Sequence, residues 1–245
     1  MDFFGVDVGG SGIKGAPVDL VHGALAQERH KVLTPQPSRP GPVAAAVKQV
    51  VDHFGWTGPV GITFPGVVTD GIIRTAANVD REWVDLPARE LFERTLERPV
   101  TVVNDADAAG IAEVAFGAAH GRPGVVLVLT FGTGIGSALF VDGTLVPNTE
   151  LGHLELDGGD AEKRASSAAR EVEDLSWPAW AERVGAYLRH VEMLFSPDLL
   201  VIGGGISRKS AKFLPLITGV RAPVVPAALH NNAGIVGAAM ACAPH

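Results

Sequence analysis

Two glycine-rich turns, each preceded by an apolar stretch typical of a buried β-strand, constrain the fold of this chain more than any other feature. The first turn lies at residues 9–12, and the second lies at residues 132–136. Because glycine has no side chain, the backbone N–H groups of such turns can approach a ligand closely, and concave arrays of N–H groups bind phosphate oxygens. Two such turns predict a duplicated phosphate-binding fold and a phosphotransferase, although each turn taken alone is also compatible with a purely structural hairpin.

Hydrophobic patterning around the turns indicates an alternation of strands and helices. The pattern predicts strands at residues 3–8, 13–20, 23–33, 60–63, 100–103, 125–131, 135–141, 144–146 and 199–202, and helices at 43–54, 86–96, 106–116, 160–195 and 231–243. The order strand, turn, strand, strand, helix occurs twice, which indicates internal duplication. The fold class is therefore α/β.

Composition excludes several classes of protein. The net charge of −7 argues against a broad basic surface for nucleic acid, so no nucleic-acid partner is expected. The single cysteine, Cys242, can form neither an internal disulfide nor a structural zinc site. The first residues lack the pattern of a signal peptide, and no apolar run of about 18–20 residues is uninterrupted, so we expect no signal peptide, no membrane span and no membrane partner. We expect a cytoplasmic protein.

Asp7 ends the first strand beside the first glycine turn. A carboxylate at this position can hold Mg²⁺, directly or through water, while Lys14 and the amides of residues 9–12 face a phosphate. The alternative is an aspartate that only stabilises the turn. The turn matches neither the Rossmann nor the Walker spacing.

Asn104 and Asp105 lie where an apolar strand ends and a helix begins. Ligands of open α/β sheets bind outside such strand ends, and an aspartate there can act as the general base for an attacking hydroxyl. The alternative is a helix N-cap, for which both residue types are favoured. Asp107 is interpreted as a charge in the first helical turn.

Glu150 and His153 are three residues apart, with Gly152 between them, and can converge on neighbouring hydroxyls of a sugar. A zinc site is the alternative, but one histidine with scattered carboxylates is a poor zinc ligand set. Glu162 and Glu171, further along the chain, can each supply one more polar contact.

Residues 203–205 are three glycines that follow a buried strand. They form either a tight strand–helix turn or a flat platform for a nucleotide base or ribose. The basic residues that follow are either a solvated helix face or part of a track for a polyanion: Arg208, Lys209 and Lys212.

Eight stretches of the chain together carry a family resemblance. They are residues 6–15, 63–68, 75–80, 103–109, 130–137, 148–155, 195–199 and 231–234. In this order they resemble the ROK sugar kinases of the actin-like ATPase superfamily, and within them the polyphosphate glucokinase branch of actinobacteria. The resemblance extends from residue 3 to about residue 241.

The resemblance implies a duplicated actin-like (ribonuclease H-like) fold of two lobes with a substrate cleft between them. The lobes would be residues 1–103, joined by the tail helix 231–245, and residues 104–230. Asp105 is implied as the base that accepts the proton of the glucose 6-hydroxyl. The implied glucose-binding residues are Asn78, Asn104, Asp105, Glu150, His153 and Glu162, with Glu171 as the alternative to Glu162. The implied phosphate-binding residues are Asp7, Gly9, Gly10, Ser11, Gly12, Lys14, Thr130, Gly132, Thr133, Gly134 and Gly136.

The chain departs from the broad ROK pattern at one segment. Most members carry a cysteine-rich zinc loop after the Glu-x-Gly-His motif, whereas residues 163–170 contain no cysteine. The resemblance therefore implies Mg²⁺ as cofactor and no zinc. The same segment adds positive charge, and the full polyphosphate track we predict is Arg164, Arg170, Arg208, Lys209 and Lys212.

The expected function is phosphorylation of the glucose 6-hydroxyl, with inorganic polyphosphate as donor and with or without use of ATP. Residue spacing alone does not decide between the two donors. The alternatives are an ATP-dependent ROK glucokinase or glucomannokinase and a sugar-sensing ROK protein without catalysis. A DNA-binding ROK regulator is not expected, because the first glycine turn begins already at Gly9. Dimers are common in the family, so the resemblance also implies a homodimer.

Overall fold

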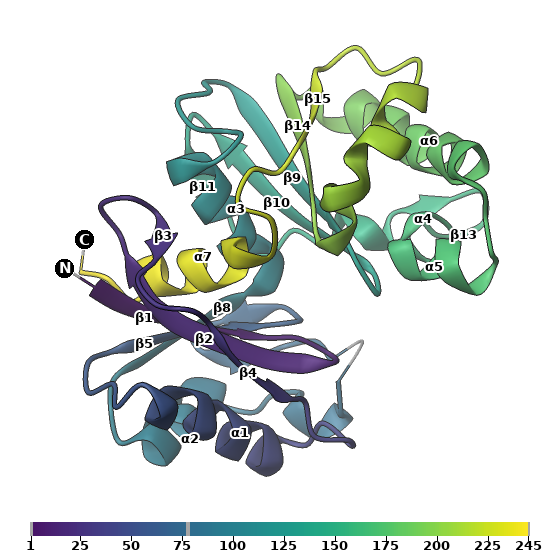
Figure 1. The fold of residues 1–245 in the computed structure, drawn as a ribbon. Helices are drawn as coiled ribbons and strands as arrows, with labels where there is room; N and C mark the ends of the chain where they lie inside the picture. The colour runs from purple at the N-terminus through teal and green to yellow at the C-terminus, as the bar shows by residue number, and fades with distance from the viewer. Residues whose placement is uncertain (1, 77–78, 245) are drawn as a thin grey trace. The chain divides into compact units, whose positions relative to one another are not determined.

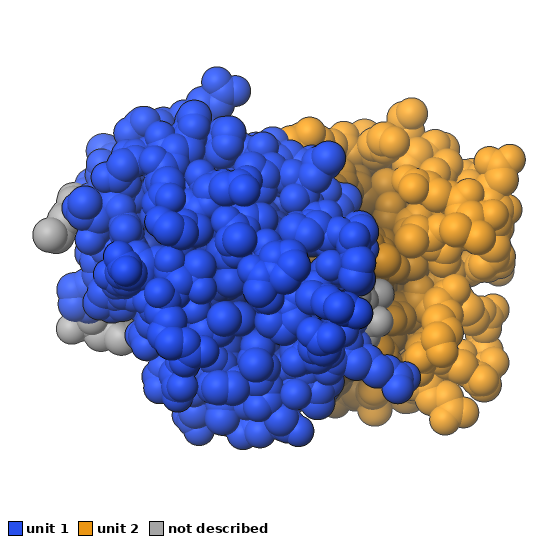
Figure 2. All heavy atoms as spheres, turned by 90° about the horizontal axis from the view of Figure 1, so that it is seen from below, with its two compact units in different colours: residues 1–112, 232–245 blue, residues 113–231 orange. Residues whose placement is uncertain are grey.

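A computed structural model describes residues 2–76 and 79–244 of the chain. The chain divides into two compact units, a first unit of residues 1–112 with 232–245 and a second unit of residues 113–231 (Figure 2). The chain leaves the first unit within helix α3 (Asp105–Phe116) and re-enters it at Asn232. The lobes expected from the sequence, residues 1–103 with 231–245 and residues 104–230, stay a prediction.

The first unit is built on a six-stranded mixed sheet. Its strand order is β3-β2-β1-β5-β8, and β4 also pairs with β2. Strands β1, β2, β3 and β4 pair antiparallel, whereas β1, β5 and β8 pair parallel, so that the carboxyl ends of these three lie at one edge. The strands are β1 (Asp2–Val8), β2 (Gly12–Asp19), β3 (Ala24–Leu25), β4 (His30–Leu33), β5 (Val60–Phe64) and β8 (Val100–Asn104).

Three helices cover the two faces of this sheet. Helices α1 (Pro40–His53) and α2 (Ala88–Leu96) lie on one face, and α7 (Ala233–Ala241) lies on the other (Figure 1). The backbone of α7 lies directly on the strands, because a Cβ atom at Gly5 or Gly61 would overlap the carbonyl groups of Ile235 and Ala238. A short hairpin, β6 (Val68–Thr69) and β7 (Ile72–Ile73), and a 3₁₀ helix, Arg81–Trp83, complete the unit.

The second unit repeats the topology of the first. Its five-stranded sheet has the order β11-β10-β9-β14-β15, in which β9, β10 and β11 pair antiparallel while β9, β14 and β15 pair parallel. The strands are β9 (Val125–Phe131), β10 (Ile135–Val141), β11 (Thr144–Val146), β14 (Leu199–Gly203) and β15 (Val224–Pro226). This shared strand order agrees with the internal duplication that the sequence predicts.

The region predicted as one long helix at residues 160–195 is divided into three. The helices are α4 (Glu162–Ala165), α5 (Ser167–Val172) and α6 (Trp177–Phe195). Ser166 and Ser176 have extended backbone conformations and cap the helices that follow, accepting hydrogen bonds from backbone N–H groups. The short strands β12 (Glu155–Leu156) and β13 (Gly159–Asp160) precede α4, and the 3₁₀ helices are Leu151–His153, Gly205–Lys212, Leu214–Leu216 and His230–Asn232.

Other differences from the predicted elements are small. The strand predicted at residues 23–33 is divided into β3 and β4, because residues 26–29 form no strand. The predicted tail helix begins at Ala233. Each unit has its own core, in which Trp83 packs with Phe64 and Phe92 in the first unit. None of the helices that the structure describes is long and apolar enough to cross a membrane.

Candidate functional site

The first glycine turn, predicted to bind phosphate, is closed by a backbone hydrogen bond. The Gly9 N–H donates to the Gly12 carbonyl at 3.1 Å, which closes the turn between β1 and β2. Thr34 and Gln36 donate to the carbonyl oxygens of Gly9 and Gly10. Over the part of the chain that the structure describes, the N–H groups of Gly10 and Ser11 have no partner. These two amides are therefore available to an anion.

Asp7 lies within a small polar cluster at the end of β1. Its carboxylate forms an ion pair with Lys14 Nζ at 2.9 Å and accepts a hydrogen bond from Thr63 Oγ1 at 3.0 Å. Asp7 and Lys14 are directly opposite residues in the β1–β2 ladder, which brings them together. Gly234 approaches closely, because a Cβ there would lie 3.0 Å from the Asp7 carboxyl carbon. Asp7 and Lys14, predicted to face Mg²⁺ and a phosphate respectively, thus form an ion pair with each other.

Asn104 and Asp105 lie at the junction of β8 and α3. The side-chain oxygen of Asn104 accepts hydrogen bonds from the N–H groups of Ala106 and Asp107 at 2.8 and 3.0 Å, so the residue caps the helix. Its side-chain amide donates to the Gly66 carbonyl at 3.0 Å. The capping role weighed for this pair in the sequence is therefore filled by Asn104, while Asp105 Oδ1 also accepts the Ala106 N–H at 2.8 Å. It fixes the backbone that carries Asp105, which is only partly buried.

Three further residues bear on the predicted site. Asn78, implied as a sugar ligand, lies outside the described residues. Asp107 is in the first turn of α3, as predicted, and its side chain is buried, with 3% of its surface exposed. Thr63, which the sequence analysis did not select, donates to Asp7 and also accepts the Val8 N–H at 3.1 Å. Its position at the end of β5, beside a Phe-Pro-Gly turn, was the available signal.

The second glycine turn resembles the first in its hydrogen bonding. The Gly132 N–H donates to the Gly134 carbonyl at 2.9 Å, and Thr130 and Gly136 pair across the β9–β10 ladder. No described residue accepts from the N–H groups of Thr133 and Gly134. Both turns therefore present two consecutive amides.

Glu162 connects this second turn to the residues predicted to bind the sugar. One carboxylate oxygen, Oε2, accepts the Ile135 N–H at 3.1 Å, directly after the turn. The other, Oε1, lies 3.8 Å from His153 Nδ1. A Cβ at Gly134 would overlap Oε2, so the glycine is needed for the carboxylate to reach the turn. Glu171, the alternative to Glu162, lies exposed on α5 and forms no hydrogen bond or ion pair with this cluster among the described residues.

Glu150 and His153 lie together at the 3₁₀ helix Leu151–His153. His153 Nε2 lies 3.9 Å from Glu150 Oε2, so the histidine is placed between Glu150 and Glu162. Gly152 allows this turn to pack on β10, because a Cβ there would overlap the Ile135 carbonyl. Burial raises the pKa of the Glu150 carboxyl above its ordinary value, and nearby His153 opposes that rise.

The five basic residues of the predicted polyphosphate track have different environments. Arg164 forms an ion pair with Asp157 at 2.6 Å. Arg170 instead lies over the Trp177 ring, with its guanidinium carbon 3.8 Å from the ring centroid, and Lys212 Nζ is 5.5 Å from the same centroid. Arg170 and Lys212 therefore approach the same ring, that of Trp177, which the sequence analysis missed.

The two remaining basic residues of the track lie in a 3₁₀ helix. Arg208 and Lys209 are exposed in the segment Gly205–Lys212, and neither has a carboxylate partner within the described residues. This segment follows Gly204, which has a φ of 79° and whose Cβ position is blocked by the Phe131 backbone. The glycine is thus required at the end of β14, next to β9.

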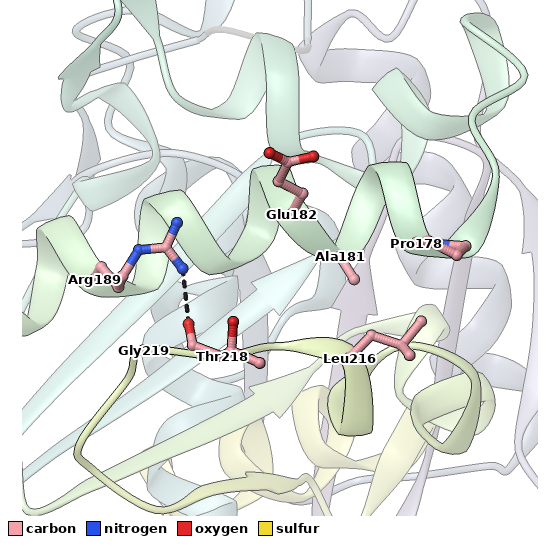
Figure 3. Close-up of a pocket in the computed structure, with 7 residues that line it drawn as sticks. All are labelled: Pro178, Ala181, Glu182, Arg189, Leu216, Thr218 and Gly219. Atoms are coloured by element: carbon pink, nitrogen blue, oxygen red, sulfur yellow. Dashed lines mark hydrogen bonds between the residues drawn. The ribbon is translucent and has the colours of Figure 1, made fainter.

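A pocket of about 580 Å³ opens on another part of the second unit (Figure 3). It lies between α6 and residues 216–219, and none of its lining residues was predicted to be functional. The lining residues are Pro178, Ala181, Glu182, Arg189, Leu216, Thr218 and Gly219. The pocket therefore shares no lining residue with the candidate active site.

The described residues offer a metal ion one carboxylate rather than a cluster of protein ligands. Among the described residues, no group of three or more histidine, cysteine, aspartate or glutamate side chains is arranged to hold a metal. Mg²⁺ is commonly bound by one or two carboxylates together with substrate phosphates and water. Asp7, with 18% of its side chain exposed beside the first turn, fits that mode of binding.

Known proteins resemble this chain over most of its length. Residues 3–168 match the family model described as "ROK family". A polyphosphate glucokinase of Mycobacterium tuberculosis is 56% identical over 239 residues, which cover 97% of this chain and 90% of that protein.

Two solved structures are similar in fold as well as in sequence. An inorganic polyphosphate/ATP-glucomannokinase from Arthrobacter sp. strain KM matches with a TM-score of 0.95 and 51% identity, covering 98% of this chain and 97% of its own. A ROK family glucokinase from Streptomyces griseus, in complex with glucose and AMPPNP, matches with a TM-score of 0.83 and 26% identity over 99% of both chains. The actin-like α/β fold class predicted from the sequence is confirmed by these matches.

Proposed function

This chain belongs to the ROK family, and on that premise we propose that it phosphorylates glucose at the 6-hydroxyl with inorganic polyphosphate as the phosphoryl donor. The observation that carries the proposal is the high identity, over nearly the whole chain, to a mycobacterial polyphosphate glucokinase. The presence of both glycine turns, Asp7 and Asp105 supports a catalytic protein over one that only senses sugar.

In the proposed reaction, the glucose 6-oxygen attacks the terminal phosphorus of the donor in line with the leaving oxygen. The hydroxyl proton passes to the Asp105 carboxylate as the new P–O bond forms. The terminal P–O bond of the donor breaks, which gives glucose 6-phosphate and a polyphosphate shortened by one unit. General-base assistance of this kind contributes about 10²–10⁴-fold to the rate.

The sugar-binding roles are proposed for the residues that the resemblance implies. Asn104 fixes the backbone at Asp105, and its amide already donates to Gly66. Glu150, His153 and Glu162 form a cluster whose carboxylate and imidazole groups suit hydrogen bonding to neighbouring sugar hydroxyls. Asn78 is proposed as an additional sugar ligand.

The donor phosphates are assigned to the two glycine turns. Each turn presents two consecutive backbone amides, and Lys14 adds a positive charge beside the first. Mg²⁺ would be held by Asp7, directly or through water, and when bound would neutralise charge on the donor oxygens. Zinc is not part of the proposal. The predicted track is proposed to contact the chain of a longer polyphosphate through Arg164, Arg170, Arg208, Lys209 and Lys212.

An ATP-dependent glucomannokinase activity is the second candidate. It is supported by the similarity to the Arthrobacter enzyme, whose name includes both donors and mannose. We further expect the chain to be cytoplasmic and to form a homodimer.

The decisive experiment measures glucose 6-phosphate formation with Mg²⁺ and either purified polyphosphate or ATP as the sole donor. Turnover mainly with polyphosphate is expected, and turnover with ATP alone would reject the donor assignment. Mannose in place of glucose tests the second candidate. Asp105→Ala should reduce the rate at least tenfold with every donor, and retention of the full rate would reject Asp105 as the base.

A further inference from the structure

Strand β4 carries a second lysine to the first glycine turn. β4 pairs antiparallel with β2 (Figure 1), and in this register Lys31 lies directly opposite Lys14. Lys14 in turn lies directly opposite Asp7 of β1. Directly opposite residues of an antiparallel pair have their side chains on the same face of the sheet. Asp7, Lys14 and Lys31 therefore form one row of charged side chains across β1, β2 and β4.

The Lys31 side chain extends from this row to the turn itself. Gly12 is two residues before Lys14 in β2, so the two positions share a face of the sheet. A Cβ at Gly12 would overlap Lys31 Cε and lie 3.2 Å from Lys31 Nζ. The space that a side chain at position 12 would take is therefore occupied by the end of Lys31, and its ammonium group is brought against the glycine turn.

The charges of the two lysines are balanced differently. Lys14 Nζ forms an ion pair with Asp7 at 2.9 Å. The Lys31 ammonium group, on an exposed residue, forms no ion pair or hydrogen bond with any described residue. Like charges directly opposite each other in a ladder are destabilising. The row therefore holds an uncompensated positive charge beside the turn, and an anion bound there would relieve the repulsion between the lysines.

The residues that follow β4 hold the turn in a conformation that suits an anion. Thr34 Oγ1 donates to the Gly9 carbonyl, and Gln36 Nε2 donates to the Gly10 carbonyl at 3.2 Å. Both side chains bind carbonyl oxygens, which leaves the turn's unpartnered N–H groups, those of Gly10 and Ser11, to a ligand. An ammonium group beside free backbone amides is a combination that binds phosphate oxygens.

We propose that Lys31 binds a phosphate group of the phosphoryl donor at the first glycine turn and determines the affinity for the donor. Lys14 then serves mainly to hold the Asp7 carboxylate, with which it is paired. The ligand class is a chain of linked phosphates, which polyphosphate and ATP share. The inference deepens the proposed function and rests on it for the identification of the ligand as the donor.

Steady-state kinetics of Lys31→Met test the role of the charge, because methionine keeps an unbranched side chain without the ammonium group. KM for polyphosphate should rise at least about tenfold, the loss expected for a hydrogen bond to a charged group. The rise should shrink at high salt, and KM for glucose should not change. Lys31→Arg retains the charge and should recover most of the affinity. Lys48→Met, at an exposed lysine that pairs with Asp52 on α1, is the matched control and should behave as wild type. The same assays with ATP show which donor uses Lys31.

Binding without glucose separates this inference from the proposed function. Inorganic tripolyphosphate should raise the Tm of the wild-type protein, because a ligand of the folded state stabilises it. Lys31→Met should be at least as stable as wild type without ligand, since its like-charge contact with Lys14 is removed. It should also need at least about tenfold more tripolyphosphate for the same rise in Tm.

The outcomes distinguish the two proposals. Binding of tripolyphosphate that depends on Lys31, in a protein that phosphorylates no glucose, would reject the proposed function and support this inference. Glucose phosphorylation with the same donor KM in wild type and Lys31→Met would overturn this inference alone. A wild-type protein that does not bind tripolyphosphate would also overturn it, as would a Lys31→Met variant whose Tm is lowered without ligand and whose KM for glucose rises with that for the donor.

Discussion

Adding a single methyl group at Gly134 should disconnect the second glycine turn from the predicted sugar-binding cluster. A Cβ at this position would overlap Glu162 Oε2 and lie 3.1 Å from the Glu162 carboxyl carbon. Because the carboxylate is the end of a flexible side chain, it can move away without unfolding the helix that carries it. Moving away removes its hydrogen bond to the Ile135 N–H and its approach to His153.

The size of the effect follows from the interaction that is lost. A hydrogen bond between a backbone N–H and a carboxylate contributes about 1.5–3 kcal/mol. The Glu162 side chain is only 19% exposed, so water compensates little for the loss. Since about 1.4 kcal/mol corresponds to a factor of ten, Gly134→Ala should lower kcat/KM for the donor about 10- to 100-fold.

A double-mutant cycle with Glu162→Ala tests the cause. The assay is donor-dependent glucose phosphorylation at saturating glucose, with thermal melting to verify that each variant is folded. In the Glu162→Ala background the added methyl group has no carboxylate to displace, so Gly134→Ala should have almost no further effect. Gly159→Ala, where no atom lies within 4 Å of the new Cβ, is the matched control and should behave as wild type.

Independent effects of the Gly134→Ala and Glu162→Ala substitutions on kcat/KM would refute this reasoning. If Gly134→Ala lowers kcat/KM by the same factor with and without Glu162, the turn does not act through the carboxylate. If Gly134→Ala has full activity, the turn functions with the Glu162 carboxylate displaced. Glu162 then has no role in positioning the donor.

Three further predictions address stability, pH and the donor. Gly61→Ala should lower the free energy of unfolding by about 3 kcal/mol, since its Cβ meets the Ala238 carbonyl. Urea unfolding measures this, with Gly41→Ala, where the new Cβ meets no atom within 4 Å, as a control that is not destabilised. Because the pKa of the Glu150 carboxyl is raised in the folded protein, this group stabilises the fold at pH values below the ordinary pKa of 4.5, and that stabilisation is lost as the pH rises. Glu150→Gln should therefore raise Tm at pH 7 but not at pH 4. Lys212→Glu should raise KM for polyphosphate, increasingly at low salt, while KM for glucose is unchanged; equal KM values for polyphosphate would remove Lys212 from the track.

The sequence was sufficient to locate the two glycine turns and the strands that lead into them. An apolar run that ends in glycine favours a strand followed by a tight turn over other local structures. The parallel pairing of β1, β5 and β8 then brings Asp7 and Asn104 to the same edge of the sheet. Asn104 shows the limit of this reasoning, because capping and ligand binding use the same chemical groups.

The contacts of Glu162 and Trp177 were beyond the reach of sequence patterns. Glu162 contacts a backbone N–H 27 residues away, and no periodicity records such a contact. A single helix over residues 160–195 would place Trp177 wrongly, because the chain changes direction at Ser166 and Ser176. Both serines begin helices as caps, and Pro178 follows the second, so local signals for the breaks were present.

The insertion of one unit into the other determines the order in which the chain can fold during its synthesis. All of the second unit, residues 113–231, leaves the ribosome before α7 does. The first sheet lacks the helix that covers Gly5 and Gly61 until residues 233–241 emerge. A stop codon placed between the second unit and α7 would therefore damage the first unit, while the second unit would be translated in full.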